Sequence, residues 1–158
     1  LLLSNNAEAY ALKRAAKANV PAKVFSRQEF REGIVLHWLK EAEITHIVLA
    51  GFLWLIPKEL ISAYPNRIIN IHPALLPKYG GKGMYGSKVH EAVKAAEDKE
   101  TGITIHLVNE KYDEGKILFQ TSVAINSTDT ADEIANKVHQ LEYAHYPEVI
   151  EKWILGKL

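Results

Sequence analysis

Asn70 and His72 are two polar residues at the end of an apolar run, in the stretch INIHPALLPKYGG of residues 69–81. Residues two apart on a strand share a face, so the amide and the imidazole point into the same volume. Pro73 keeps the backbone extended after His72, and the glycines that follow let a ligand approach the main chain closely. An amide and an imidazole placed together can hold a developing oxyanion and move a proton.

A third polar residue, Asp113, lies in the loop 109–115 between two strand-like runs. If the fold brings its carboxylate to His72, it can hold the imidazolium form, raise the pKa of the histidine and fix the ring orientation. Simpler interpretations also fit, because Asn70 and His72 resemble a turn-capping pair and Asp113 before Glu-Gly resembles a plain turn. The residues alone therefore indicate a polar pocket and leave its function open.

Other chemistries find less support in the sequence. His106 alternates with Ile105 and Leu107, as expected of a hydrogen-bonded histidine in the core or in support of a site. His72, His106 and Asp113 lack the short ligand spacings of a metal site, so we expect no metal. The chain contains no Gly-x-Gly-x-x-Gly, no P-loop and no nucleophile elbow.

Apolar runs alternate with helical patterns along the chain, which is typical of an α/β fold with parallel strands joined by helices. The runs HIVLAG and RIINIH predict central strands buried on both faces. Ser26 with Glu29 and Thr130 with Glu133 have the spacing of capping boxes, and Pro147 should kink or restart the last helix. The expected strands are residues 1–4, 22–25, 46–50, 67–71, 102–108 and 117–125. The expected helices are residues 7–17, 27–40, 86–97 and one that starts at Thr130.

Composition sets broad limits on the class of protein. The 158 residues fit one domain with a sizeable core. Nineteen basic against nineteen acidic residues give no net charge, so the overall balance points to neither nucleic acid nor an anionic membrane. The chain has no cysteine, which is compatible with a reducing compartment, and no run approaches the roughly 20 apolar residues of a membrane span. We therefore expect a cytoplasmic protein.

The stretches RIINIHPALLPKYGGKGMYG and GITIHLVNEKYDEGKILFQ together resemble the phosphoribosylglycinamide formyltransferases, a folate-dependent family of purine (IMP) synthesis. The resemblance extends through LLLSNNAEAYALKRA, VLAGFLWLIP and ADEIANKVHQLEYAHYPEVI, so it covers essentially the whole chain. It implies a Rossmann-like, mostly parallel central sheet flanked by helices, with an antiparallel C-terminal portion. It also implies transfer of a formyl group from 10-formyltetrahydrofolate to the amine of glycinamide ribonucleotide, without a metal or a covalent enzyme intermediate.

The resemblance assigns roles to particular residues. The catalytic asparagine, histidine and aspartate of the family fall on Asn70, His72 and Asp113. Trp54 stands where relatives often have arginine, so we expect ring packing there instead of a charge contact. The folate site carries over to Arg27, Leu53, Trp54, Leu55, Ile56, Asn70, Glu110, Lys111, Tyr112 and Asp113. The ribonucleotide site carries over to Gly80, Gly81 and Glu142.

Members of the family begin with a strand and a phosphate-binding loop, and this sequence starts after them. The expectation is a single formyltransferase domain over residues 1–158 that lacks its first strand and helix, a segment of roughly thirty residues. Formyltetrahydrofolate hydrolase, methionyl-tRNA formyltransferase and a non-catalytic folate- or nucleotide-binding module are the alternatives. The expected partners are the two small-molecule substrates, and the expected state is a monomer or a homodimer.

Overall fold

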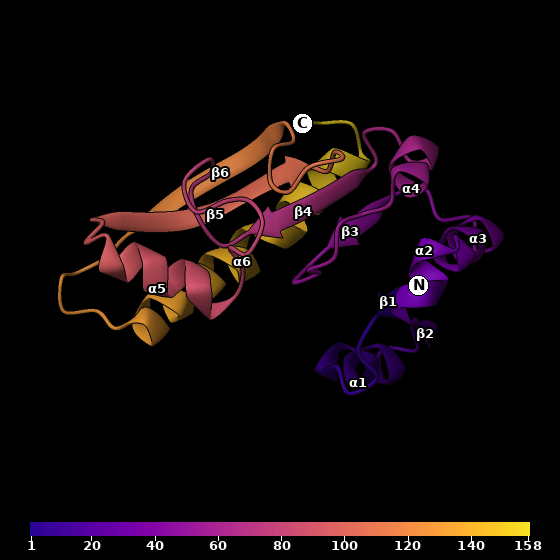
Figure 1. Cartoon of the computed structure of the whole chain (residues 1–158), viewed down its shortest axis with the longest axis horizontal. Coiled ribbons are helices and arrows are strands. Elements are labelled where there is room, and N and C mark those ends of the chain that lie inside the picture. Colours follow the sequence, from indigo (N-terminus) through magenta and orange to yellow (C-terminus); the bar gives the residue numbers. More distant parts are fainter. The chain divides into compact units, whose positions relative to one another are not determined.

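Six strands and six helices form in the computed structural model, which describes residues 1–158 (Figure 1). The predicted α/β class is confirmed, and all six predicted strands are present with ends that agree within two residues. The chain divides into two compact units. The first unit comprises Leu1–Thr45 and Pro57–Ala63, and the second comprises His46–Ile56 and Tyr64–Leu158.

The first unit contains a pair of short parallel strands and four helices. Strand β1 (Leu2–Ser4) pairs with β2 (Ala22–Val24). The helices are α1 (Tyr10–Lys17), α2 (Arg27–Arg31), α3 (Ile34–Glu41) and α4 (Lys58–Ala63). Ser26 caps α2, with its hydroxyl accepting from the Glu29 amide while the Glu29 carboxylate accepts from the Ser26 amide, so the predicted capping box is confirmed.

The second unit is built on a four-stranded sheet in the order β3-β4-β5-β6 (Figure 1). Its strands are β3 (Ile47–Leu49), β4 (Ile68–His72), β5 (Glu100–Leu107) and β6 (Ile117–Ala124). β3 and β4 are parallel, whereas β4–β5 and β5–β6 are antiparallel, as expected for the C-terminal portion. The helices are α5 (Ser87–Ala95) and α6 (Ala131–Ile154).

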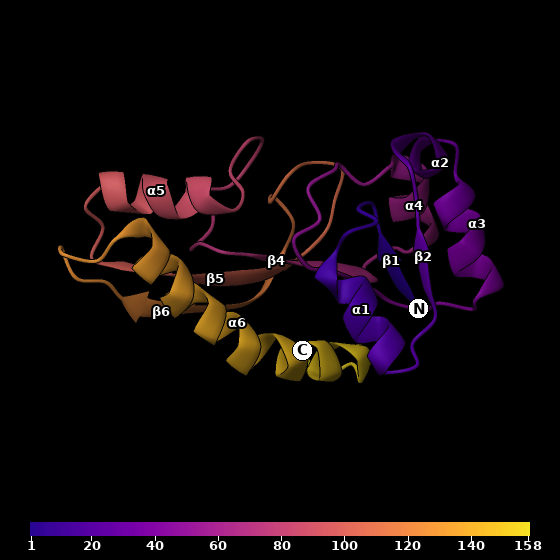
Figure 2. The same ribbon diagram turned by 90° about the horizontal axis from the view of Figure 1, so that it is seen from below.

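Helix α6 covers one face of this sheet (Figure 2). It contributes Val138, Tyr146 and Val149 to a buried cluster whose sheet residues are Ile69, Ile71, Ile103 and Ile105. The first turns of α6 pack against α5 through Ile134 and Val93. Thr130 and Glu133 form the second predicted capping box at the start of α6. Apolar burial at helical spacing therefore holds this long helix on the sheet.

Four local predictions differ from the structure. The predicted helix 27–40 is two helices, because Gly33 between them has a left-handed φ of 81°, which an α-helix cannot contain. Helix α4 was not predicted, since its six residues are too few to show a clear period. Of the two outcomes expected at Pro147, a kink or a restart, the restart is wrong, because α6 continues through this residue. Pro147 is exposed, so water can satisfy the carbonyl that loses its partner.

The fourth difference concerns β3, which lies at the edge of the four-stranded sheet. Its Val48 is 39% exposed, so the prediction of burial on both faces holds for β4 and is wrong for β3. A short apolar run contains too few residues to distinguish one buried face from two. None of the helices has both the length and the hydrophobicity that crossing a membrane would require.

Candidate active site

Asn70 and His72 lie at the carboxyl end of β4, as predicted. Their neighbours come from β5, where His106 stands opposite Asn70 and Thr104 stands opposite His72. Directly opposite residues in an antiparallel pair project from the same face of the sheet. The register between β5 and β6 shifts between Ile105 and His106, and such irregularities re-aim side chains near functional sites. The strand register thus brings a second histidine beside the predicted pair.

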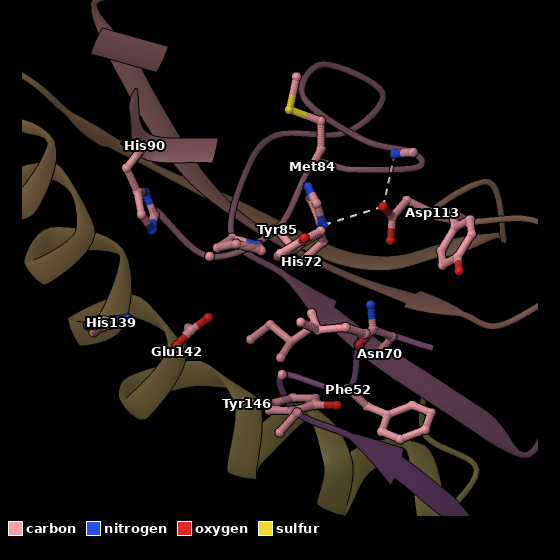
Figure 3. A pocket seen from close by; sticks show the side chains of 18 of the residues that line it. Phe52, Asn70, His72, Met84, Tyr85, His90, Asp113, His139, Glu142 and Tyr146 are labelled. Carbon is pink, nitrogen blue, oxygen red and sulfur yellow. Dashed lines mark hydrogen bonds and ion pairs between the residues drawn. The ribbon is translucent and has the colours of Figure 1, made fainter. Parts of the chain in front are cut away.

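His72 is almost fully buried and lies between two acceptors. Its Nε2 donates to the main-chain oxygen of Tyr79 at 2.7 Å. Its Nδ1 lies 3.5 Å from Asp113 Oδ2 (Figure 3). The condition set for Asp113, that the fold bring its carboxylate to His72, is therefore met. The pKa of His72 is nevertheless lowered, because burial outweighs the opposing effects of Asp113 and the Tyr79 carbonyl. Asp113 does raise this pKa, as expected, but desolvation is the larger effect.

Asp113 connects the two histidines of the site. Its Oδ1 lies 3.5 Å from His106 Nε2, and its Oδ2 accepts from the Gly81 amide at 2.9 Å. Burial alone raises the pKa of Asp113, but His106, His72 and the Gly81 amide together lower it below the ordinary value. Its backbone has a left-handed φ of 56°, which Asp and Asn tolerate better than most residues. Asp113 is therefore held as a carboxylate in a constrained loop.

The loop that carries Asp113 closes tightly because of Gly115. A Cβ at this position would overlap the carbonyl group of Leu107, so no other residue fits without a shift of the main chain. The Glu-Gly pattern after Asp113 does mark a turn, as the simpler interpretation holds. The same turn also brings the carboxylate to His72. The two interpretations of Asp113 are thus compatible.

His106 orients the amide of Asn70. The Nδ1 of His106 lies 2.9 Å from the Leu107 carbonyl, which can only accept, so this nitrogen carries a proton. Its Nε2 lies 3.3 Å from Asn70 Nδ2 and 3.5 Å from Asp113 Oδ1: in the neutral ring it accepts from the Asn70 amide, and in the charged ring it donates to Asp113, which is the form that lowers the pKa of Asp113. The second proton on Asn70 Nδ2 is left to donate to a ligand. His106 is 3% exposed, so the prediction of a buried, hydrogen-bonded histidine is confirmed.

A buried hydrogen-bond network fixes the chain as it leaves β4. The Thr104 hydroxyl donates to the Ala74 carbonyl at 2.7 Å and accepts from the Leu76 amide at 3.0 Å. Gln120 of β6 donates to the same hydroxyl at 2.8 Å and to the Leu76 carbonyl at 3.1 Å. A satisfied buried network of this kind makes a segment rigid. The segment that follows His72 is therefore tied to β5 and β6.

These residues form part of the wall of one cavity of about 760 Å³, a size that accommodates a drug-sized ligand. Asp113 lies on one side of the cavity and Glu142 and His139 of α6 lie on the other, with His72 between them (Figure 3). Burial raises the pKa of Glu142. The predicted site residues that line the cavity are Leu53, Asn70, His72, Gly81, Tyr112, Asp113 and Glu142.

The remaining predicted site residues lie elsewhere and stay predictions. Trp54 packs edge-on against Phe52, with ring centroids 5.8 Å apart, and Ile56 is buried in the core. Arg27 is the first residue of α2, in the other unit. The predicted site residues that belong to the second unit but do not line the cavity are Trp54, Leu55, Ile56, Gly80, Glu110 and Lys111.

Several residues that line the cavity were not predicted. Phe52 follows β3, and His90 projects from α5. Tyr146 lies one helical turn after Glu142 and donates from its hydroxyl to the Leu49 carbonyl at 2.7 Å. The spacing of four between Glu142 and Tyr146, and of three between His139 and Glu142, offered a signal for the lining face of α6. His90 offered a comparable signal, since it sits between the buried Val89 and Val93 of α5.

His90 predicts a pH dependence of stability. It is 4% exposed, its Nδ1 has no hydrogen-bond partner, and burial together with His139 and His72 lowers its pKa below 6.5. Between that lowered pKa and 6.5, the unfolded chain binds more protons than the folded one, so stability falls as the pH falls. We expect urea denaturation to show a smaller free energy of unfolding at about pH 5.5 than at about pH 7.5.

The variant His90→Leu should flatten this dependence, because it removes one of the buried histidines that resist protonation. Some slope will remain, since the pKa of His72 is lowered in the same way. His37→Leu is the matched control, because His37 is exposed in α3. Equal slopes for the wild type and His90→Leu would contradict the prediction.

Comparison with known proteins shows the family to which the chain belongs. A sequence model of the formyl transferase family matches residues 1–150. The chain belongs to this formyl transferase family. It is 42% identical over 156 residues to the chloroplastic phosphoribosylglycinamide formyltransferase of Arabidopsis thaliana, with 95% of this chain and 53% of that protein covered. It therefore spans about half the length of this plant relative.

The chain covers a larger share of two further relatives. Phosphoribosylglycinamide formyltransferase of Haemophilus influenzae is 36% identical over 162 residues, with 99% of this chain and 74% of that protein covered. The crystal structure of phosphoribosylglycinamide formyltransferase from Streptococcus pneumoniae TIGR4 superposes with a TM-score of 0.86 at 33% identity, covering 96% of this chain and 84% of that one. The fold expected from the resemblance is therefore confirmed.

Proposed function

We propose that this formyl transferase passes a formyl group from 10-formyltetrahydrofolate to the amine of glycinamide ribonucleotide, in purine (IMP) synthesis. The observation that carries the proposal is the convergence of Asn70, His72 and Asp113 on one cavity wall. The relatives named as phosphoribosylglycinamide formyltransferases support the choice of substrates. Family membership by itself supports a formyl donor of the folate type.

Each of the three residues on the cavity wall has a separate role in the reaction. When the amine attacks the formyl carbon, Asn70 donates a hydrogen bond to the developing oxyanion through its second amide N–H, and protonated His72 stabilises the same charge. Asp113, which is held as a carboxylate, stabilises the imidazolium form of His72 and assists transfer of a proton from the attacking amine to N10 of the folate. The bond between N10 and the formyl carbon then breaks, so that tetrahydrofolate leaves and the formyl group stays on the amine. Because the groups are fixed before the reaction, little reorganisation accompanies the transition state.

The rest of the cavity suits the two substrates. Leu53, Phe52 and Tyr112 give one part an apolar and aromatic lining for a pterin ring, together with the main chain of the loop 109–115. Glu142 at the other end can accept hydrogen bonds from ribose hydroxyls, and Gly81 leaves room for the nucleotide beside His72. The chain has no cysteine, and we propose a cytoplasmic location and a monomer or homodimer. The single formyltransferase domain over residues 1–158 remains part of this proposal.

A transfer assay with the full-length protein tests the proposal. Purified protein is incubated with 10-formyltetrahydrofolate, with and without glycinamide ribonucleotide, and the folate product is followed by its absorbance. We expect turnover that depends on the ribonucleotide and yields formylated product. Formate released without the ribonucleotide would support the hydrolase alternative. Folate binding without either reaction would support a binding module.

A further inference from the structure

The turn Tyr79–Gly80–Gly81 contacts both members of the His72–Asp113 pair. The Tyr79 carbonyl accepts from His72 Nε2 at 2.7 Å, and the Gly81 amide donates to Asp113 Oδ2 at 2.9 Å. A Cβ on Gly80 would lie 2.6 Å from Leu76 Cδ2 and 3.4 Å from Asp113 Cβ, so the turn packs closely against the loop of Asp113. The turn is thus the direct link between the histidine and its carboxylate.

The carbonyl of Tyr79 determines which nitrogen of His72 carries the proton. A carbonyl oxygen can only accept a hydrogen bond, so Nε2 must be protonated in both the neutral and the charged ring. In the neutral ring, Nδ1 then holds the lone pair and faces Asp113 Oδ2 at 3.5 Å. Tautomer selection by a neighbouring acceptor leaves one defined nitrogen available for proton transfer. For His72 that nitrogen is Nδ1.

Tyr79 keeps this carbonyl in place in spite of an unfavourable backbone conformation. Its φ of 55° is left-handed, which is uncommon for a bulky residue and persists only where the surroundings hold it. Its ring packs against the buried cluster of Val93, Ile125 and Ile134. Its hydroxyl donates to Asp98 Oδ2 at 2.7 Å. The side chain is therefore anchored at both the ring and the hydroxyl.

Asp98 is itself fixed as a carboxylate. Lys78 Nζ donates to its two oxygens at 2.7 and 2.8 Å, and these bonds together with that from the Tyr79 hydroxyl lower the pKa of Asp98. Asp98 lies just beyond α5, and neither it nor Tyr79 lines the cavity that contains His72. The hydrogen bond from Tyr79 to Asp98 thus connects the region beyond α5 to the histidine without touching a ligand in the cavity.

We propose that Tyr79 is a positioning residue for His72: its hydrogen bond to Asp98 holds the left-handed turn whose carbonyl selects the Nε2–H tautomer of the histidine. The kinetic consequence rests on the proposed function, whereas the tautomer itself does not. The other titratable groups around His72 are Asp113 of the loop 109–115, His106 of β5 and His90 of α5. None of these side chains is hydrogen-bonded to the Tyr79 hydroxyl or to Asp98.

The variants Tyr79→Phe and Asp98→Asn test this proposal, because each removes the hydroxyl–carboxylate bond and keeps the ring or the shape. The ¹⁵N chemical shifts of the His72 ring are measured at about pH 7.5, where its lowered pKa favours the neutral form. We expect a protonated Nε2 and an unprotonated Nδ1 in the wild type, and a mixture of tautomers in both variants. Asp129→Asn is the matched control, since Asp129 is also bound to a lysine, Lys137, but has no contact with the turn.

Kinetics supply the second measurement. We expect kcat for formyl transfer to fall about tenfold in Tyr79→Phe and Asp98→Asn, with KM for both substrates little changed, because the loss is one of orientation. The Tyr79 carbonyl raises the pKa of His72, so loosening this contact in the two variants should lower that pKa. The pH above which activity is lost should therefore be lower in the variants than in the wild type. If the wild type proves to have no transferase activity, the proposed function fails and the nitrogen shifts still decide this proposal.

Three results would overturn the role of Tyr79. The first is a wild-type His72 that carries its proton on Nδ1. The second is Tyr79→Phe and Asp98→Asn with the nitrogen shifts of the wild type. The third is a tautomer mixture of the same size in Asp129→Asn, because that would trace the change to general loosening of the fold.

Discussion

His72→Ala is expected to lower kcat for formyl transfer about a thousandfold, which corresponds to about 4 kcal/mol of transition-state stabilisation. The side chain is 4% exposed and lies between the Tyr79 carbonyl and Asp113, so no other group is positioned to take over its proton. KM for both substrates should change little, because the interaction forms mainly in the transition state. Steady-state kinetics with both substrates varied measure these constants.

The control for this variant is His37→Ala, which removes an exposed histidine from α3 and should keep the activity of the wild type. Thermal unfolding of His72→Ala shows whether the loss of a buried side chain has reduced the folded population. A folded His72→Ala protein that keeps activity within about tenfold of the wild type would contradict the proposed role, because general acid–base catalysis typically contributes more.

Asp113→Asn is expected to lower kcat about a hundredfold. The change is nearly isosteric, and Asn tolerates the left-handed φ of 56° at this position as Asp does. The amide oxygen can still accept from Gly81, so the loop should keep its conformation. What disappears is the negative charge that stabilises the imidazolium form of His72. The loss should therefore appear in kcat and leave the melting temperature within a few degrees.

The pH dependence of Asp113→Asn has a definite sign. Asp113 raises the pKa of His72, so its removal lowers that pKa further. If protonated His72 is the active form, the activity of the variant will be lost at a lower pH than that of the wild type as the pH rises. Asp132→Asn, an exposed change in the first turn of α6, is the control. A variant profile that coincides with the wild type would argue against electrostatic support of His72 by Asp113.

Local patterns were sufficient for much of the fold. The six strands follow from short apolar runs, and the starts of α2 and α6 follow from the capping boxes at Ser26 and Thr130, which involve residues only three apart. The sequence shows a glycine at position 33 but does not show that the helix breaks there, because a glycine can also be accommodated inside a helix. Tertiary packing settled which of the two conformations forms.

In the candidate site, too, some features follow from local sequence and others only from tertiary packing. The chain itself placed Asn70 and His72 on one face of a strand end, because that depends only on their spacing of two. It could not place Asp113 beside His72 or His106 beside Asn70, since these contacts join residues 41 and 36 positions apart in the sequence. The register of β4 with β5 and the tight loop at Gly115 create them. The role of the Tyr79 carbonyl cannot be predicted from the side-chain pattern, because every residue has a main-chain carbonyl. The left-handed turn at Tyr79 directs this carbonyl at His72.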